Sequence, residues 1–324
     1  MDLLALGTPV IDLFARASDA DLKGLGVKKG ATSYFSAKKV AELEQKLGKR
    51  VKHCYPGDNA RNVCEGFAAL SGFCGFAGAI GSDSAGGQFE SNLAECGIAP
   101  FLQRKKGSTG RIIALVTPDK QRTFLADLGV SEKCTSFEAM AVKSSRMFYV
   151  STITLVGKKP CARLAIRYIE AFRKAKKPVA ISVENPPMVH QHRALLLSMI
   201  RKYADVLFLN KDEAESLLGR DFAGKLLLLK TRVPIYLKLG AAGSALYLGC
   251  KRQQIAPLEA EVMDTTGAGD AYAAGALYGL SRGYSPLSSG KIGCFLATKV
   301  VGKLGAGIPL RHIRLPIGKK RGLR

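Results

Sequence analysis

Short apolar segments alternate with helical patterns along most of this chain of 324 residues. Strands separated by helices of this length favour a mostly parallel sheet that is covered on both faces. We predict strands at residues 3–11, 74–79, 146–150, 179–183, 206–209, 235–239 and 244–248. We predict helices at residues 37–47, 60–70, 86–96, 161–175, 191–203, 211–218, 269–280 and 286–301. The alternation therefore indicates an α/β fold with three layers.

One region, residues 99–125, breaks this alternation. It contains the consecutive strand-like segments "APFLQRK", "TGRIIALVTP" and "QRTFLAD", with turns at Gly107 and "PDK". We predict an antiparallel flap that projects from the main sheet. The chain has no repeat, low-complexity segment or linker, so we expect one domain over residues 1–324 with this flap appended.

Composition excludes several classes of protein. Hydrophobic residues make up 47% of the chain, enough for a full core, but no apolar run reaches the eighteen residues of a membrane span. The start, "MDLLALGTPVID", lacks the basic region of a signal peptide. The eight cysteines are scattered, which favours reduced thiols in a cytoplasmic protein over disulfides or metal ligands.

The net charge of +23 raises the question of nucleic-acid binding. Most basic residues are dispersed, and the only block is the tail 311–324, which has six Lys or Arg and no acid. No zinc-finger, RNP or helix-turn-helix pattern accompanies it. Specific nucleic-acid binding is therefore disfavoured, although the charge would draw anionic ligands toward a cleft.

The strongest chemical signal is the stretch 261–280, "EVMDTTGAGDAYAAGALYGL". It reads as a strand end, a glycine-containing turn and an apolar helix. The first amides of such a helix lack partners and form an anion site. Asp270 lies in the first turn, where the helix dipole favours a carboxylate and where it is not needed as a cap. We predict that Asp270 has a chemical role.

Three stretches in the first third of the chain carry further candidates. "TPVID" leaves Asp12 at the carboxyl edge of the first predicted strand, where ligands of open α/β sheets bind. "YPGDNARNVCEGFAAL" opens a helix with Asn62 in its first turn, although Asp58 or Asn59 could simply cap that helix. "FAGAIGSDSAGGQF" places Asp83 between a glycine turn and a helix.

Two later stretches also have a functional and a structural interpretation. "LFLNKDEAESLL" places Asn210 and Glu213 between a strand and a helix, where they could form only a capping box. "YLKLGAAGSALY" has Gly240 and Gly243 between two strands, where they could be only hairpin glycines.

Four of these motifs resemble, in the same order, those of the PfkB (ribokinase-like) carbohydrate kinases. "DTTGAGDAYAAG" resembles the second signature of that family, and "GAIGSDSAGGQFESNLAECGI" resembles the first. "FLNKDEA" is similar to its Asn-x-x-Glu motif, and "KLGAAGSALY" to its nucleotide-side hairpin. The segments "LGVKKGATSYFSAKKVAEL" and "TGRIIALVTPDKQRTFLADLG" look more like the adenosine- and nucleoside-kinase branch.

The resemblance implies a ribokinase-like fold and transfer of the ATP γ-phosphoryl group to a primary hydroxyl. It implies that Asp270 is the base and that the amides of Gly267, Ala268 and Gly269 form the anion hole. The other implied site residues are Asp12, Gly57, Asp58 and Asn62 for the acceptor; Asn210, Lys238, Gly240 and Thr266 for the nucleotide; and Glu213 for Mg²⁺, reached through waters.

The same resemblance implies a lid that excludes water, built from segments near 12–36 and 99–125. Arg122, on the flap, is then a candidate for a phosphate contact. Two departures from the family pattern bear on the acceptor. Asp58 stands where the family usually has a second glycine, and could bind a substrate hydroxyl or amine or only cap a helix. "ISVENPP" replaces the more usual Asp-x-Asn, leaving Glu184 and Asn185 as candidate site residues.

Three hypotheses follow for the function. A nucleoside kinase is favoured, with Tyr34, Phe35 or Phe101 as walls of a slot for the base. A sugar or sugar-phosphate kinase of the same family is the alternative, and a phosphorylated acceptor would need a basic cluster in its pocket. A non-catalytic scaffold is the third, opposed by the intact "GAGD". The acceptor, any activation by monovalent ions, and the choice between monomer and homodimer stay open.

Overall fold

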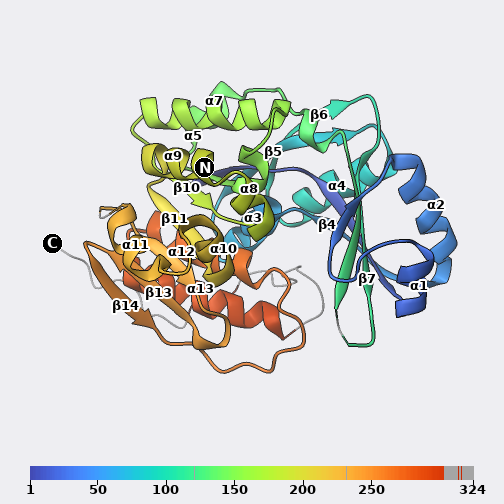
Figure 1. Cartoon of the computed structure of the whole chain (residues 1–324). Coiled ribbons are helices and arrows are strands. Elements are labelled where there is room, and N and C mark those ends of the chain that lie inside the picture. Colours follow the sequence, from blue (N-terminus) through green and yellow to red (C-terminus); the bar gives the residue numbers. More distant parts are fainter. Residues whose placement is uncertain (120, 231, 303–312, 314, 316–324) are drawn as a thin grey trace.

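The computed structural model describes residues 1–119, 121–230, 232–302, 313 and 315, and these residues form two β-sheets with helices around them (Figure 1). In this part of the chain the larger sheet has nine strands in the order β14-β13-β12-β11-β10-β9-β1-β5-β6. Their bounds are β1 Leu3–Leu6, β5 Cys74–Gly81, β6 Ala99–Lys105, β9 Met147–Ser151, β10 Val179–Ser182, β11 Val206–Asn210, β12 Ile235–Lys238, β13 Ser244–Leu248 and β14 Lys251–Ile255. The strands from β12 to β6 in this order run parallel, and β13 and β14 are antiparallel to their neighbours.

Helices cover both faces of this sheet, so the three-layer prediction is confirmed. Leu4 and Leu6 of β1 pack into one core that includes a first group of four helices, and Leu3 and Ala5 pack into a second core that includes another group of four, as the two-residue period of a strand requires. The first group is α7 Pro160–Lys174, α9 Arg193–Tyr203, α10 Lys211–Leu218 and α11 Phe222–Leu229. The second is α3 Asn59–Ala69, α4 Ser84–Glu95, α12 Ala268–Ser281 and α13 Pro286–Val301.

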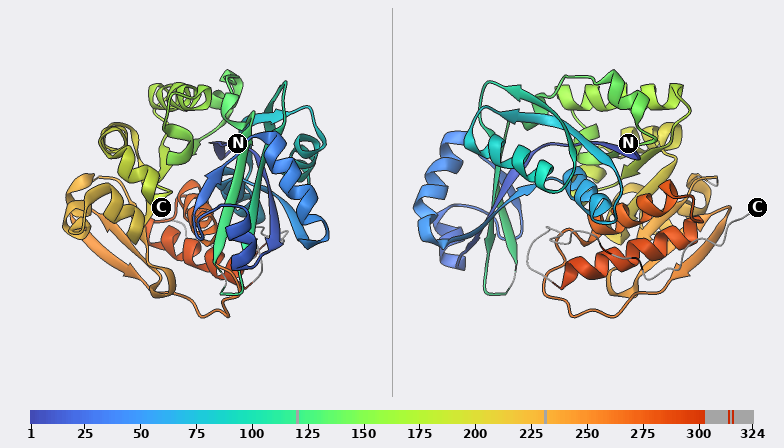
Figure 2. Two further views of the ribbon diagram at one scale, coloured as in Figure 1. Left: turned by 45° about the vertical axis from the view of Figure 1, so that its right-hand side comes forward. Right: turned by 180° about the vertical axis from the view of Figure 1, so that it is seen from behind.

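A second, five-stranded sheet among the described residues projects from one side of the larger one (Figure 2). Its order is β3-β8-β7-β2-β4, with bounds β2 Val10–Arg16, β3 Thr32–Tyr34, β4 Val51–Gly57, β7 Thr109–Val116 and β8 Arg122–Gly129. Helices α1 Asp19–Gly24 and α2 Ala37–Leu47 lie on its outer side (Figure 1). We call these five strands the small sheet. Three short helices complete the elements named here: α5 Ala139–Ser144, α6 Thr152–Leu155 and α8 Pro186–Gln191.

The predicted first strand, 3–11, is wrong as a single element. Residues 7–9 separate β1, in the large sheet, from β2, in the small sheet. Pro9 has no amide to donate, and the Thr8 amide donates to the Asp58 carboxylate instead of to a strand. Asp12 therefore lies on the small sheet and not at the edge of the large one.

The predicted flap is wrong in one of its three strands. β7 and β8 are antiparallel neighbours in the small sheet, but β6 pairs in parallel with β5 at the edge of the large sheet. Strand propensity does not specify the partner, which long-range packing decides. The small sheet also contains β4, an unpredicted edge strand that tolerates Pro56.

Two further boundaries differ from the predictions. The helix predicted at 191–203 is α9, which begins two residues later, and a short helix that was not predicted, α8, ends just before it at Gln191. Residues 261–263 lie in a loop and do not end a strand. By contrast, α2, α10, α13 and β13 have the predicted bounds.

Small residues in α12 and α13 bring these two helices into backbone contact. A Cβ added at Gly275 would lie 2.6 Å from the carbonyl oxygen of Ile292, and one at Gly293 would lie 2.7 Å from that of Tyr272. This close packing explains the run of glycine and alanine after Asp270 and holds the start of α12 firmly.

Two predictions from composition can be compared with the described residues. Within them no helix combines the length and apolar character needed to cross a membrane. All eight cysteines are free, and five of them are buried. The basic tail 311–324 lies outside the described residues except for Ile313 and Leu315, which pack against the core that contains Leu3 and Ala5.

Candidate active site

The candidate site lies at the carboxyl edge of the large sheet, where the parallel strands end together. Glu184 follows β10, Asn210 ends β11 and Lys238 ends β12. The first turn of α12 and the first turn of α3 meet at the same edge, since Asn62 of α3 contacts Asp270 of α12. This is where ligands of open α/β sheets bind.

The turn before α12 has the geometry predicted for an anion site. Gly267 caps the helix in the left-handed region, with φ of 76°, and no side chain caps the amides that follow. A Cβ added at Gly269 would lie 3.1 Å from the Lys238 ammonium nitrogen, so this lysine lies directly against the turn. The helix N-terminus and Lys238 together present positive potential to one small volume.

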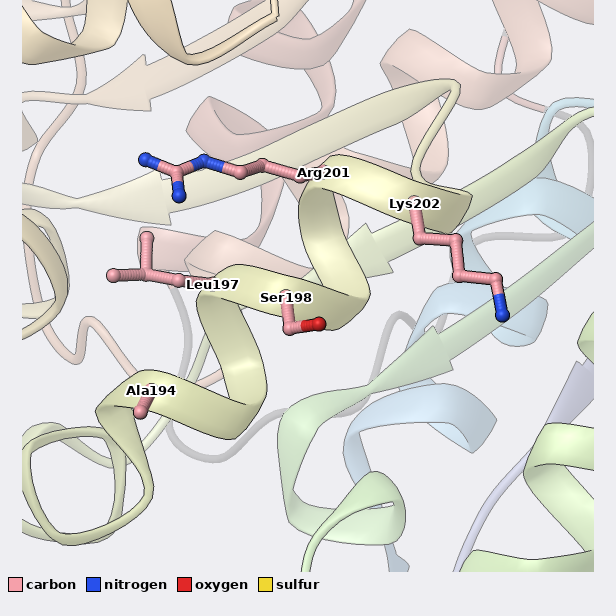
Figure 3. Close-up of a pocket in the computed structure, with 5 residues that line it drawn as sticks. All are labelled: Ala194, Leu197, Ser198, Arg201 and Lys202. Atoms are coloured by element: carbon pink, nitrogen blue, oxygen red, sulfur yellow. The ribbon is translucent and has the colours of Figure 1, made fainter.

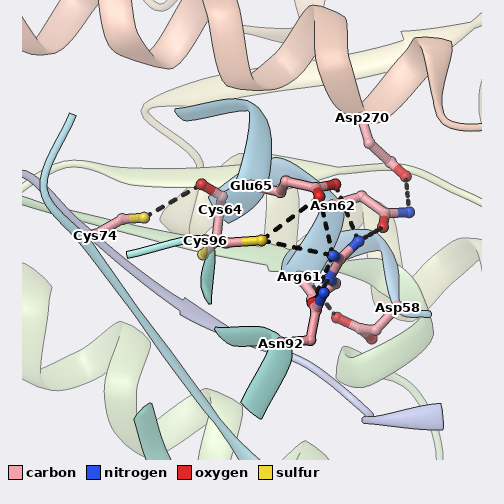
Figure 4. A network of polar contacts seen from close by, with 9 residues as sticks. All are labelled: Asp58, Arg61, Asn62, Cys64, Glu65, Cys74, Asn92, Cys96 and Asp270. Atoms are coloured by element: carbon pink, nitrogen blue, oxygen red, sulfur yellow. Dashed lines mark hydrogen bonds and ion pairs between the residues drawn. The ribbon is translucent and has the colours of Figure 1, made fainter. Parts of the chain in front are cut away.

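Asp270 is buried, with 8% of its surface exposed, and two asparagines hold its carboxylate. Asn62 Nδ2 donates to Oδ2 at 2.9 Å (Figure 4). Asn59 Nδ2 donates to Oδ1 at 3.4 Å. Burial raises the pKa of Asp270 to about 6, against the opposing effects of Asn62 and Lys238. A carboxylate with this pKa is ionised at neutral pH yet basic enough to accept a proton in a reaction.

Asn62 belongs to a buried polar network that sequence reasoning missed. Arg61 Nη1 donates to Asn62 Oδ1 at 3.1 Å, and its guanidinium forms an ion pair with Glu65 one turn along α3. Asn92 of α4 accepts from the same guanidinium at 2.6 and 3.1 Å. The i, i+4 spacing of Arg61 and Glu65 was visible in the sequence, but their burial was not.

Asp12, Gly57 and Asp58 lie together near the start of α3. Gly57 allows close approach, because a Cβ there would lie 2.1 Å from Asp12 Oδ2. Burial raises the pKa of Asp12 to about 7, and no hydrogen bond of its carboxylate appears among the described residues. Asp58, at φ of 151°, caps α3 by accepting from the Arg61 amide and also accepts from Thr8. Its predicted capping role is therefore present.

Asn210 and Glu213 form the capping box that the sequence allowed. Glu213 N donates to Asn210 Oδ1 at 2.9 Å, and Asn210 N donates to Glu213 Oε2 at 2.6 Å. The same Glu213 oxygen lies 3.9 Å from the Lys238 ammonium. Burial raises the pKa of Glu213, and Lys238 opposes this. In addition to its role in the capping box, Glu213 has a second carboxylate oxygen, Oε1, that can accept from a ligand.

Glu184 is the least satisfied carboxylate at this edge. It is 6% exposed, and its Oε2 has no hydrogen-bond partner among the described residues. Burial raises its pKa well above the usual range, Asp270 adds to this, and Lys238 opposes it. A buried, unpaired carboxylate oxygen is costly unless something else neutralises it. Neighbouring Asn185 instead caps α8, in the left-handed region.

Thr266 and Arg122 connect the small sheet to the loop before α12. Arg122 of β8 donates to Thr266 Oγ1 and forms an ion pair with Asp264, and Thr266 donates to the same carboxylate at 2.7 Å. Arg122, the residue predicted to contact a phosphate, therefore contacts Thr266 and Asp264 of the protein itself. This contact between two sheets was not predictable, because it joins residues 142 positions apart.

The remaining predicted residues take varied places. Asp83 caps α4 and also accepts from the amide and hydroxyl of Thr109, which is a structural role. Gly240 lies in an exposed turn with open space beside it. Tyr34 is exposed on the edge strand β3. Phe101 packs beside Gly75, at the end of the sheet away from Asp270, so it is not a wall of this site.

A surface pocket of about 600 Å³ lies elsewhere, on α9 (Figure 3). Its lining residues all come from this one helix: Ala194, Leu197, Ser198, Arg201 and Lys202. None of them belongs to the motifs or to the buried acidic group, so this pocket has no part in the candidate site.

Comparison with known proteins bears on this geometry. The model of the family described as pfkB family carbohydrate kinase matches residues 30–313. The chain belongs to the pfkB family. Like other pfkB proteins it is a kinase, which confirms that expectation, and ATP is the phosphoryl donor that the family implies.

Similar pfkB proteins include both sugar and nucleoside kinases. An uncharacterized sugar kinase of Archaeoglobus fulgidus is 27% identical over 245 residues, 72% of this chain and 94% of that protein. The crystal structure of adenosine kinase from Sinorhizobium meliloti matches with a TM-score of 0.85 and 28% identity, covering 94% of this chain and 95% of that one. A probable sugar kinase from Rhizobium etli matches with a TM-score of 0.85 and 25% identity, covering 94% of each chain. The predicted ribokinase-like fold is confirmed by these neighbours.

Proposed function

We propose that this pfkB kinase transfers the γ-phosphoryl group of ATP to the primary, 5'-type hydroxyl of a nucleoside. The observation that carries the proposal is the position of Asp270, a buried carboxylate held by two asparagines in the first turn of α12. Directly before it come the uncapped amides of the Gly267 turn, with Lys238 against Gly269.

In the proposed reaction Asp270 accepts the proton of the acceptor hydroxyl. The hydroxyl oxygen forms a bond to the γ-phosphorus as the bond to the ADP oxygen breaks. Charge on the phosphoryl oxygens is stabilised by the amides of Gly267, Ala268 and Gly269 and by Lys238. Positioning and charge stabilisation account for most of such catalysis, so one base beside a rigid amide turn suffices.

The residues also fit a magnesium ion, which such transfer needs. Glu213 and Glu184 offer carboxylate oxygens, the ligand type that Mg²⁺ prefers, and the unpartnered Glu184 Oε2 would gain a partner from the ion or its water shell. Among the described residues no three His, Cys, Asp or Glu side chains are placed as direct ligands, which favours contact through water. Bound there, Mg²⁺ would neutralise phosphate charge.

For the acceptor we assign Asp12 and Asn62 to the sugar hydroxyls, with Gly57 and Asp58 beside them. For the nucleotide we assign Asn210, Gly240 and Thr266 in addition to Lys238. The small sheet, with Asp12 on β2 and Arg122 on β8, would close over these groups as a lid within one kinase domain. The free thiols fit a cytoplasmic protein, which would work as a monomer or homodimer.

A sugar kinase of the same family is the second candidate. The similar sugar kinases of A. fulgidus and R. etli support it as well as the S. meliloti adenosine kinase supports the first. The acidic groups near Gly57 suit hydroxyl donors in either case.

The test is turnover of Mg-ATP against nucleosides (adenosine, inosine, guanosine, cytidine, uridine) and against sugars (ribose, fructose, fructose 6-phosphate). Asp270→Asn should keep ATP affinity and lower kcat by about two to four orders of magnitude. Asp83→Asn, at a helix cap outside the proposed chemistry, serves as the stability control. Turnover on sugars alone would move the acceptor to the second candidate, and a loss below tenfold in Asp270→Asn would remove Asp270 as the base.

A further inference from the structure

The buried guanidinium of Arg61 faces the back of Asn62, the residue that holds Asp270. Arg61 is 3% exposed, and its position is fixed from two helices. Nη1 and Nη2 contact Glu65 at 3.0 and 3.1 Å on α3, and Nε and Nη2 contact Asn92 on α4. Figure 4 shows Arg61, Asn62 and Asp270 in sequence across the network.

This arrangement dictates which way the Asn62 amide points. A guanidinium only donates hydrogen bonds, so it can face only the oxygen of a carboxamide. Asn62 Oδ1 accepts from Arg61 at 3.1 Å, which directs Nδ2 to the other side, where it donates to Asp270 at 2.9 Å. With the amide reversed, its oxygen would face the carboxylate and its NH₂ would face the guanidinium, so both contacts would be repulsive.

Other charged groups also face Asp270. Lys238 at the end of β12 favours its ionised form, and Asp58 before α3 opposes it. Glu184 after β10 is a further acid, whose pKa the Asp270 charge raises. Asn59 adds a second, longer hydrogen bond to the other oxygen. The hydrogen bond from Asn62 is therefore the shorter of the two that these asparagines donate to the carboxylate, and the direction of the Asn62 amide matters most.

We propose that Arg61 is a positioning residue, which locks the Asn62 amide so that it donates to Asp270 and holds that carboxylate ionised and oriented. The inference deepens the proposed function and rests on it for its catalytic meaning. The physical claim about Arg61, Asn62 and Asp270 can nevertheless be measured without turnover.

The experiment measures the pKa of Asp270 by NMR of aspartate ¹³C-carboxyl labels in the full chain, with its signal assigned from Asp270→Asn. Removing Arg61 alone would leave Glu65 buried without its cation, so the test variant is Arg61→Met combined with Glu65→Gln. We expect the pKa of Asp270 to rise by about one unit, because a hydrogen bond to the charged form is lost. The rising limb of the kcat/KM profile should move by the same amount.

Glu65→Gln alone is the matched control, since it breaks the ion pair but keeps the Arg61–Asn62 hydrogen bond. Because it leaves the Arg61 charge without its anion, the pKa of Asp270 should stay the same or fall in this variant, and it should not rise. Asn62→Ala should raise that pKa as the double variant does, and the triple variant should raise it no further. If Arg61→Met/Glu65→Gln does not fold, Arg61→Gln/Glu65→Gln replaces it, because two amides can pair with each other.

The outcomes separate the two proposals. Equal pKa values in the double variant and in Glu65→Gln would overturn the positioning role. A shifted pKa together with full turnover in Asp270→Asn would overturn the base assignment and leave the Arg61 effect standing. An equal rise of the Asp270 pKa in Asn62→Ala, with no further rise in the triple variant, supports the Arg61–Asn62 contact. It also supports the proposal that Arg61 acts on Asp270 through Asn62.

Discussion

At the scale of single residues, the site is a group of carboxyl groups whose pKa values are all raised by burial. Burial is the largest influence on the pKa of Asp12, Asp58, Glu184, Glu213 and Asp270, and it raises each of them. Burial of acids in this way lowers the stability of the folded protein at neutral pH, but it gives the site groups that can accept protons at that pH. The fold tolerates this cost because Lys238 and Arg61 lie among them.

Asp12 provides a test of that cost. Its folded-state pKa lies at about 7, above its ordinary 3.8, so the folded protein binds more protons than the unfolded chain between these values. Stability should therefore fall as pH rises through this window, and the penalty should be absent below it. Asp12→Asn should stabilise the protein by roughly 1 to 2 kcal/mol at pH 8, less than full conversion of the shift because the group is partly exposed.

Urea unfolding of Asp12→Asn and the wild-type protein from pH 4 to pH 8 measures this difference. Asp83→Asn is the control of opposite sign. Burial acts to raise the pKa of Asp83, but hydrogen bonds from Thr109 and Gly86 lower it overall, so its contribution is present at neutral pH and is lost on acidification. A stability difference for Asp12→Asn that does not change with pH would contradict the prediction.

At the scale of elements, the start of α12 is held from three sides. α13 packs against its small residues, α3 reaches Asp270 through Asn62, and β8 reaches the preceding loop through Arg122. The last of these is the polar link from the small sheet to the proposed phosphate site. Asp264 is buried, so removal of Arg122 takes the cation away from a buried carboxylate that also accepts from the amide and hydroxyl of Thr266.

We expect Arg122→Ala to loosen the contact between the small sheet and the α12 loop. Amide hydrogen exchange in residues 264–268 should become about fivefold faster, which corresponds to roughly 1 kcal/mol for a partly buried ion pair. Arg111→Ala is the matched control, because Arg111 of β7 forms its ion pair with Glu44 of α2, within the small-sheet unit. Equal exchange rates in both variants at residues 264–268 would show that Arg122 does not link the two sheets.

At the scale of the whole molecule, the net charge of +23 contrasts with the acidic site. The basic residues are dispersed along the chain, so the positive field that would draw ATP toward the protein comes from the whole molecule. In the proposed site, by contrast, only Lys238 and helix amides are assigned to the phosphates. Ile313 and Leu315 pack on the core, and Ile313 N donates to Ala69 O. The substitutions in the next prediction therefore leave residues 311–315 unchanged.

Replacing Lys319, Lys320, Arg321 and Arg324 by glutamine should weaken binding to a polyanion such as heparin and flatten its dependence on salt. Turnover should stay within about twofold of wild type, because diffusion of ATP rarely limits a kinase with kcat of about 1–100 per second. Heparin affinity measured at several salt concentrations, beside kinase assays, tests both parts. Unchanged affinity would assign the polyanion binding to the dispersed charges.

Much of the architecture and the family could be predicted from the sequence, because both depend on local signals. Apolar periodicity located most strands of the large sheet and eight helices, but it missed β3, β4, β14, α1, α5, α6, α8 and α11. Turn chemistry located the glycine turn before Asp270 and the caps at Asp58 and Asn210. These features involve residues a few positions apart, so neighbouring residues determine them. The motif order likewise led to the pfkB family, which the family match confirms.

Only the tertiary structure decided which distant segments meet. It assigned β6 to the large sheet and β2 to the small one, and it brought Asn62 against Asp270 across 208 positions. It also buried Arg61 and Glu184, whose surroundings no local pattern reveals. Long-range strand pairing depends on competition among many strands and side chains for the same core. The burial that raises the pKa of each acid exists only after the whole chain has folded.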